Sequence, residues 1–201
     1  MFEWPYILDY WFGELTPQGL PDLQSRQFWF NASRRDDQVI RRRFFTMVLL
    51  ASEDGLRHWR AEPGGALAEI LLLDQFSRHI HRRQSLAFRN DALALKLARE
   101  GVDRGRDVSL PMVQRAFFYM PFQHSERLRV QKEGLDLYYQ LVRTAEGPLR
   151  ELLENFYRSA QRHHDIVARF GRFPHRNAVL KRPSSEEERT WLAQDRSGFG
   201  Q

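Results

Sequence analysis

A continuous apolar stripe near the C-terminus is the feature that most constrains the fold of this chain. Its residues recur four and three positions apart, as on one face of an α-helix: Leu149, Leu153, Phe156, Ala160, His163, Val167 and Phe170. Gly147-Pro148 favours a helix start, Gly171 is placed for a left-handed C-terminal cap, and Pro174 prevents the helix from resuming. The pattern predicts one long amphipathic helix that ends in a sharp basic corner.

The rest of the chain shows the same helical periodicity. No stretch alternates apolar and polar residues between turn signals, so we expect no β-sheet. The most hydrophobic segment, residues 66–82, is interpreted as one helix, and Ser184-Ser185-Glu186-Glu187-Glu188 as the capping-box start of a last helix. The sequence predicts an all-α protein of about eight to ten helices of short to medium length. With 201 residues and no flexible linker, we expect a single domain over residues 1–201.

Composition limits the classes of function. There is no cysteine, which excludes disulfides and cysteine-based metal sites. Arginine and lysine exceed aspartate and glutamate by 31 to 26, but acidic residues are interspersed and there is no basic tail, so a nucleic-acid partner is disfavoured. The first residues lack the positive region of a signal peptide, and the longest aliphatic run, residues 70–73, is too short to span a bilayer. We therefore expect a soluble cytoplasmic protein without a membrane partner.

Three polar residues interrupt apolar helix faces: Asp74, Gln131 and His163. Arg78 follows Asp74 by four positions, which is the spacing of an ion pair within one helix. Each interruption has a structural explanation: an Asp74–Arg78 ion pair, a hydrogen bond between helices from Gln131, and a core histidine with one partner. The alternative is that these residues converge on a site, because buried polar groups cost free energy unless they have partners.

Five segments of the chain carry a resemblance to a known family: LDYWFGEL, LLLDQFSRHIHR, FRNDALALKLA, RAFFYMPFQHSE and HHDIVARFGRFPHRN. In this order, and over nearly the whole chain, they resemble the bacterial domain-of-unknown-function family 924. The resemblance implies an all-helical fold related to tetratricopeptide repeats, and a site without assigned chemistry. The family pattern falls on Asp74, Gln75, Arg78, Arg115, His124, Ser125, Glu126, Gln131, His163, Arg172, His175, Arg176 and Asn177. The chain departs from the pattern at His79, where members often read DQFPRN, and at Lys181, where a glycine is common.

We expect these residues to line a pocket for an anionic small molecule, which could be an active site. His124 or His163, acting with Glu126, could form an acid–base pair, so these three are the candidate catalytic residues. The candidate ligand-binding residues are Asp74, Gln75, Arg78, Arg115, Ser125, Gln131, Arg172, His175, Arg176 and Asn177. The sequence names neither a reaction nor a cofactor, and it leaves open whether the protein is an enzyme.

The anion hypothesis makes two geometric predictions. His124, Glu126, His163, Arg172 and His175 should converge in space, because the basic corner folds back after Gly171 and Pro174 and short loops make sequential helices neighbours. If Arg115, Arg172 and Arg176 also converge, only one or two carboxylates are expected beside them, so the empty pocket should carry positive potential. Arginine binds carboxylate and phosphate groups in bidentate fashion.

Two other functions stay open. A fold like that of tetratricopeptide repeats commonly presents a concave surface to a protein or peptide partner. His124, Glu126, His163 and His175 could also hold a metal ion, although the spacings are not diagnostic and the nearby arginines would repel a cation. We therefore favour the anionic ligand and assign no metal-binding residues. Ser125 with His124 is a poor nucleophile–base pair, since adjacent residues on a helix project about 100° apart.

Overall fold

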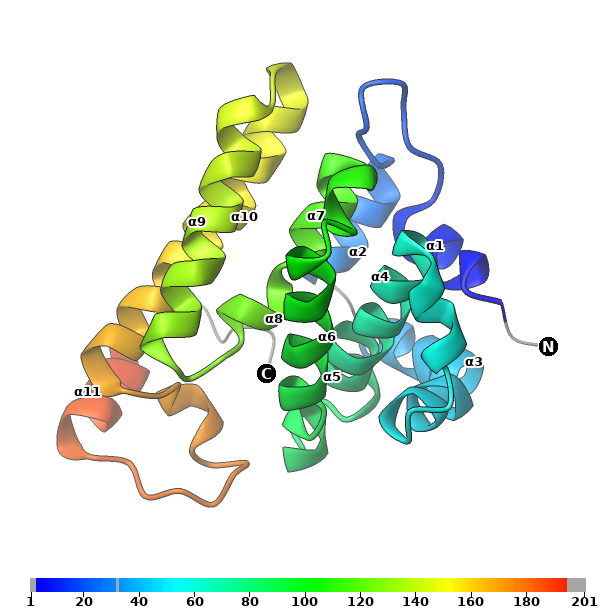
Figure 1. Cartoon of the computed structure of the whole chain (residues 1–201). Helices are drawn as coiled ribbons and strands as arrows, with labels where there is room; N and C mark the ends of the chain where they lie inside the picture. The colour runs from blue at the N-terminus through cyan, green and yellow to red at the C-terminus, as the bar shows by residue number, and fades with distance from the viewer. Residues whose placement is uncertain (1–2, 32, 195–201) are drawn as a thin grey trace.

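The protein is all-helical, as the sequence predicts (Figure 1). The computed structural model describes residues 3–31 and 33–194, and that part of the chain contains no β-strand. Its α-helices are α1 (Pro5–Phe12), α2 (Leu23–Asn31), α3 (Arg34–Ser52), α4 (Pro63–Leu71), α5 (Ser77–Ile80), α6 (Asp91–Asp103), α7 (Met112–Phe118), α8 (Met120–Gln123), α9 (Leu128–Thr144), α10 (Gly147–Phe170) and α11 (Glu186–Gln194). Short 3-10 turns span Arg57–Ala61, Ser85–Phe88, Asp107–Ser109 and Pro174–Arg176. None of the described helices is long and apolar enough to cross a membrane.

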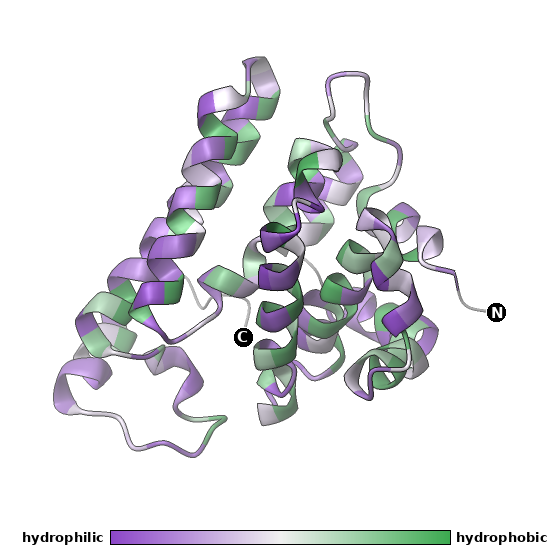
Figure 2. Ribbon diagram, in the orientation of Figure 1, coloured by the Kyte–Doolittle hydropathy of each residue, from purple (hydrophilic) through white to green (hydrophobic). Residues whose placement is uncertain are grey.

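The two longest C-terminal helices, α9 and α10, pack side by side along one edge of the molecule (Figure 1). The predicted stripe of α10 is confirmed, because Leu153, Phe156, Ala160 and His163 are buried. Helix α10 also contacts α7 and α8, so its stripe faces the rest of the core. Green apolar segments accordingly alternate with purple polar ones along both long helices in Figure 2.

The segment over residues 66–82 is not the single α-helix that its hydropathy predicts. Helix α4 ends at Leu71, a π-helical turn spans Leu72–Phe76, and α5 follows. Ser77 stabilises the turn, because both its backbone N–H and its hydroxyl donate to the Leu72 carbonyl oxygen, the hydroxyl at 3.1 Å. Such turns insert one extra residue into a helix and frequently mark functional sites. Here the inserted turn contains Asp74.

The basic corner forms as predicted at the end of α10. Gly171 has φ +68°, in the left-handed region, and its N–H donates to the Val167 carbonyl oxygen at 2.8 Å. The chain then folds back through the turn Pro174–Arg176 to α11. Lys181 has φ +54°, which explains why glycine suits this position, and the turn forms although lysine occupies it. The predicted capping box is present between Ser185 and Glu188.

Candidate functional site

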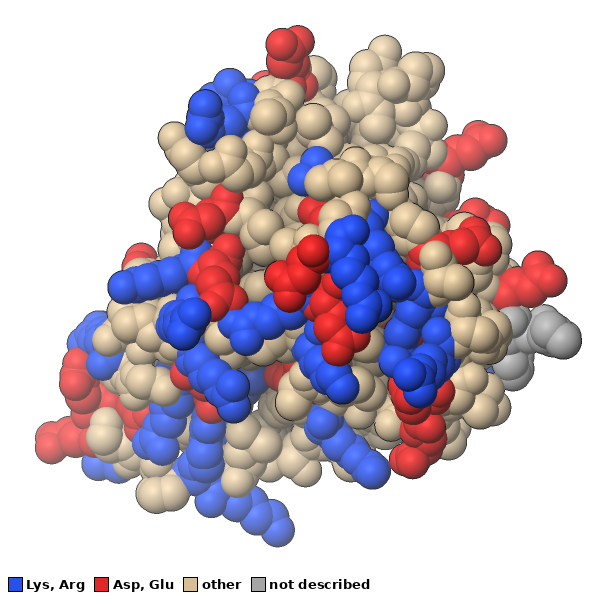
Figure 3. Space-filling view, in the orientation of Figure 1, with Lys and Arg blue, Asp and Glu red and all other residues tan. Residues whose placement is uncertain are grey.

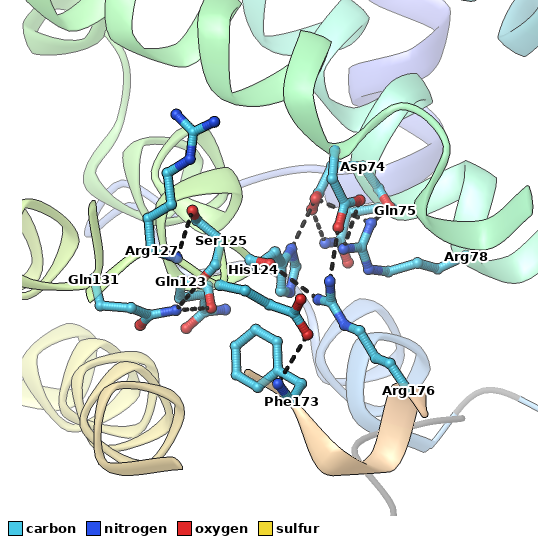
Figure 4. Close-up of polar contacts among 12 residues, drawn as sticks. Asp74, Gln75, Arg78, Gln123, His124, Ser125, Arg127, Gln131, Phe173 and Arg176 are labelled. Atoms are coloured by element: carbon cyan, nitrogen blue, oxygen red, sulfur yellow. Dashed lines mark hydrogen bonds and ion pairs between the residues drawn. The ribbon is translucent and has the colours of Figure 1, made fainter. Parts of the chain in front are cut away.

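Asp74 lies at the centre of a buried polar cluster (Figure 4). Its side chain is 1% exposed, and one carboxylate oxygen, Oδ1, lies 2.7 Å from His124 Nδ1 and 3.1 Å from Arg78 Nη1. The other oxygen, Oδ2, accepts a hydrogen bond from Gln75 Nε2 at 2.5 Å. Burial alone would raise the pKa of Asp74, but the charge of Arg78 and the hydrogen bonds from His124 and Gln75 hold it well below its usual range. The predicted ion pair with Arg78 is therefore present, and Asp74 is ionised at neutral pH.

His124 is the C-terminal cap residue of α8, and it contacts Asp74 although the two residues lie fifty positions apart in the sequence. An ionised carboxylate can only accept, so Nδ1 of His124 carries the proton and Nε2 is the accepting nitrogen. Burial and the positive charge of Arg78 lower the pKa of His124 despite the opposing charge of Asp74. The imidazole is therefore neutral at pH 7, with Nε2 able to take a proton.

His163 brings a second neutral imidazole from α10. Its ring centroid lies 5.9 Å from that of His124, and its Nδ1 lies 2.8 Å from the Ser159 carbonyl oxygen. Burial, followed by the charge of His124, lowers the pKa of His163 to about 3. Both sequence-based interpretations therefore apply to His163. It is buried with a hydrogen-bond partner, and its ring also faces His124.

Arg176 reaches this cluster from the C-terminal loop. Its guanidinium carbon lies 4.4 Å from the ring centroid of Phe88 and 4.5 Å from that of Phe173. Nη1 donates to Asp91 Oδ2 and Nη2 to the His124 carbonyl oxygen, both at 3.0 Å. The residue is only 6% exposed. Arg176 therefore ties the loop to the His124 backbone and to the start of α6.

The positive charge of Arg176 is incompletely compensated. Asp91 is shared, since its Oδ1 also lies 2.9 Å from Arg78 Nη2. Burial, reinforced by the charge of Arg78 and only partly offset by Asp91, lowers the pKa of Arg176 to about 10. Nε of Arg176 is buried and makes no hydrogen bond within the part of the chain that the structure describes. We call Asp74, Arg78, Asp91, His124, His163 and Arg176 the His124 cluster.

Glu126 has a different set of partners. Its carboxylate accepts two hydrogen bonds from Arg182, at 2.7 and 2.8 Å, and one from the Phe173 N–H at 2.8 Å. Burial opposes these interactions, but Arg182 and the Phe173 N–H keep the pKa of Glu126 below its usual value. Three donors on an ionised carboxylate make Glu126 an anchor for the returning loop, and they leave it poorly suited to be the acid–base partner of a histidine.

Phe173 connects the predicted site residues of the corner. Its ring centroid lies 5.5 Å from that of His163 and 5.3 Å from that of His175, while its N–H binds Glu126. Arg172, the preceding residue, turns away. The predicted convergence thus holds for the three histidines and Glu126, whereas the Arg172 guanidinium belongs to a separate contact.

That separate contact fixes α11. Arg172 donates to both carboxylate oxygens of Glu188, at 2.6 and 2.8 Å, and to the Pro183 carbonyl oxygen at 2.9 Å. Asn177 Nδ2 adds bonds to Glu188 and to the Ser184 hydroxyl at 3.3 and 3.1 Å. Arg172 and Asn177 therefore hold the last helix, and their predicted role in contacting a ligand has no geometric support.

Arg115 lies in a third group, on α7. Its guanidinium donates to the Tyr119 hydroxyl at 3.1 and 3.2 Å and lies 3.6 Å from Asp107 Oδ2. Arg115, Arg172 and Arg176 thus make three separate sets of contacts, and these contacts do not meet the condition that the three guanidinium groups converge. Each lies beside a carboxylate, although Arg176 shares Asp91 with Arg78, and Figure 3 likewise shows acidic side chains among the arginines and lysines of one face.

Gln131 and Ser125 complete the positions predicted from the sequence. Gln131 Nε2 donates to the carbonyl oxygens of Gln123 and Ser125 at 2.7 and 2.6 Å, across the turn between α8 and α9. The Ser125 hydroxyl accepts from the Arg127 N–H at 3.2 Å. These bonds match the structural explanation for Gln131, and they hold the backbone on both sides of His124. Within the described residues, no group of three or more acidic or histidine side chains is arranged to hold a metal ion.

Two residues of this region were missed by sequence reasoning, Asp91 and Arg182. Asp91 reads as an ordinary acidic residue in the first turn of a helix, and Arg182 as one of many surface arginines. Their roles arise from contacts with Arg176 and Glu126, which lie 85 and 56 residues away. No local pattern signals pairs at such separations.

Comparisons with known proteins found a matching family model and a similar solved structure. A family model described as "Bacterial protein of unknown function (DUF924)" matches residues 7–196. The solved structure of a protein of unknown function from Agrobacterium tumefaciens is 33% identical, with a TM-score of 0.81, and the match covers 96% of this chain and 97% of that one. None of the curated protein sequences compared with the chain is detectably similar to it.

Proposed function

The chain belongs to the bacterial family of proteins of unknown function DUF924, and we propose that it binds a small anionic molecule at the His124 cluster, where His124 accepts a proton. The observation that carries the proposal is Arg176, a guanidinium that is 6% exposed and whose Nε lacks a hydrogen-bond partner among the described residues. An unmade hydrogen bond from a buried donor costs about 1–3 kcal/mol, and more for a charged group. A carboxylate or phosphate oxygen would supply the missing acceptor and charge.

The arrangement around His124 supports proton transfer. Asp74 fixes the tautomer and orientation of the imidazole through Nδ1, and Arg78 and Gln75 fix Asp74 in turn. An oriented, neutral imidazole is a suitable general base near pH 7. The π-helical turn that carries Asp74 adds support, because an irregular turn is retained more readily where it positions a functional group.

The two neutral histidines couple to the charge of the ligand. His124 and His163 stay neutral partly because burial and neighbouring positive groups disfavour their imidazolium forms. An anion beside Arg176 would offset that repulsion and raise both pKa values. A ligand that arrives with an acidic proton could therefore transfer it to Nε2 of His124 and remain bound as the anion.

The test is a thermal-shift and calorimetric screen with inorganic phosphate, phosphomonoesters, dicarboxylates and divalent metals. It compares the wild type with Arg176→Gln and His124→Asn, and uses Arg115→Gln as the control, because Arg115 is also an arginine paired with a carboxylate but lies outside the His124 cluster. An anion at a hundred times its dissociation constant should stabilise the wild type and Arg115→Gln by about 2.7 kcal/mol. Arg176→Gln should lose most of that stabilisation.

Three outcomes would oppose the proposal. Equal stabilisation of wild type and Arg176→Gln by an anion would show that the anion binds outside the His124 cluster. Stabilisation by a transition metal alone, lost in His163→Asn, would favour the metal alternative. An open groove occupied by a peptide, with no response to any small molecule, would favour the protein-binding alternative.

A further inference from the structure

A cleft lies among α1, α2 and the start of α3, and none of its lining residues belongs to the His124 cluster. It has a volume of about 510 Å³ and is lined by Tyr10, Gln24, Ser25, Gln27, Phe28 and Asp36. Small-molecule sites commonly occupy roughly 300–1,000 Å³. The lining combines two aromatic rings, one carboxylate and three uncharged polar side chains, which is a chemically selective set.

Phe28 forms a fixed wall of this cleft. Its ring stacks on His79, with centroids 5.6 Å apart and planes 7° from parallel, and meets Trp11 edge-on at 5.3 Å. His79 is itself held by Asp37, which lies 2.8 Å from its Nδ1. Rotation of Phe28 would break both ring contacts. The aromatic wall is therefore preorganised, which lowers the entropy cost of binding a ligand against it.

Asp36 supplies the charge of the cleft. Its Oδ2 accepts from the N–H and the hydroxyl of Ser33, both at 2.7 Å, and these bonds lower the pKa of the carboxyl group against the effect of burial. Its other oxygen, Oδ1, makes no hydrogen bond to the described residues, and no described cation pairs with Asp36. The adjacent Asp37 differs, because Arg82 binds it at 2.6 Å. Asp36 thus presents an ionised, half-exposed and unneutralised carboxylate.

The aromatic surface beside the cleft already holds a cation. The Arg43 guanidinium lies 4.9 Å from the ring centroid of Tyr10 and 5.3 Å from that of Tyr6, and it donates to the Tyr6 hydroxyl at 2.8 Å. Arg43 donates its hydrogen bonds to Tyr6 and forms no ion pair with Asp36. Rings of this kind attract cations through their negative faces. Because Arg43 already covers one face of Tyr10, the cleft offers a positively charged ligand the Asp36 carboxylate, with Phe28 and the rest of Tyr10 as aromatic walls.

We propose that this cleft binds a small organic ammonium ion, with the ammonium group beside Asp36 and its apolar part against Tyr10 and Phe28. Gln24 and Gln27 also line the cleft, and their side-chain carbonyl oxygens can accept hydrogen bonds from the remaining N–H groups of a primary ammonium. The ligand class is opposite in charge to that proposed for the His124 cluster, so the two proposals stand or fall separately.

Benzylammonium is the probe, with benzyl alcohol and benzoate as neutral and anionic analogues of similar shape. Binding is measured by calorimetry and by ligand-observed NMR on the full-length chain. Asp36→Asn should weaken benzylammonium binding by about tenfold or more, because it removes charge-assisted hydrogen bonds. Phe28→Leu keeps an apolar side chain but removes the ring, and should weaken binding by about two- to fivefold.

Ser33→Ala is the matched control. It removes the Ser33 half of the α3 capping box while keeping the Asp36 carboxylate, so it separates a loss of helix capping from a loss of charge in the cleft. It should lower the melting temperature but leave binding within about twofold of wild type. The proposal is overturned if the folded wild type does not bind benzylammonium at millimolar concentration, if benzyl alcohol binds equally well, or if Ser33→Ala and Asp36→Asn weaken binding equally.

Discussion

Replacing Asp74 by alanine tests the buried polar cluster through stability. The substitution removes a carboxylate that is 1% exposed and leaves three partners to adjust: Arg78, His124 and Gln75. Arg78 retains Asp91 at 2.9 Å, whereas the Nδ1–H of His124 loses its acceptor in a buried position. Removing one partner of a buried ion pair costs about 3–5 kcal/mol. The retained Asp91 places Asp74→Ala near the lower limit, at about 3 kcal/mol.

The chain offers a close control for this measurement. Arg60 also pairs with two carboxylates, the buried Glu69 and the 52%-exposed Asp54. Asp54→Ala likewise leaves its arginine with one carboxylate, but the lost charge is in solvent, so the ion pair should account for less than about 1 kcal/mol. Alanine at φ +62° adds about 1 kcal/mol of backbone strain, which still leaves the total below that for Asp74→Ala. Both variants are measured by urea unfolding, with the slope of the transition checked for two-state behaviour. A midpoint for Asp74→Ala no lower than that for Asp54→Ala would refute the reasoning.

Two further predictions concern the corner and its histidine. Glu126→Gln and Arg182→Gln should each destabilise the protein by about 1–3 kcal/mol. In a double-mutant cycle, the double variant should lose less stability than the sum of the two single variants. Additive losses would contradict a direct interaction between Glu126 and Arg182. The pKa of His163 in the folded protein, about 3, lies below its ordinary value of 6.5. The stability that depends on neutral His163 is therefore fully present above pH 6.5 and is lost as the pH falls toward 3, by up to about 4–5 kcal/mol. His163→Gln should flatten that part of the stability–pH curve, and an unchanged slope would show that His163 does not titrate as a buried group.

The structural features that could be predicted from the sequence are those set by residues a few positions apart along the chain. The stripe of α10 identified His163 as buried, the spacing of four identified the Asp74–Arg78 pair, and Gly171 with Pro174 located the corner. Each of these rests on helical periodicity or backbone chemistry, which act over a few residues.

The sequence fails where partners come from distant segments. Asp74 and His124 meet only after α8 packs beside the π-helical turn, and a slip of one hydrogen bond within a helix leaves no trace in hydropathy. Arg115 and Arg172 were grouped with Arg176 because all three fall on the family pattern, but the pattern does not reveal Asp107 or Glu188 as their partners. Charge neutralisation is a tertiary property, so a count of arginines overstated the positive potential.

The central claim is that His124 is a partly buried, neutral base whose proton affinity rises when an anion reaches Arg176. The most direct measurement is an NMR titration of histidine-labelled protein, with the His124 signals assigned through His124→Asn, in the absence and presence of inorganic phosphate. We predict that His124 is protonated on Nδ1 alone at pH 7, with a pKa below 6.5 that phosphate raises in the wild type but not in Arg176→Gln. A His124 that is already charged at pH 7, or a pKa that phosphate shifts equally in both proteins, would contradict the account.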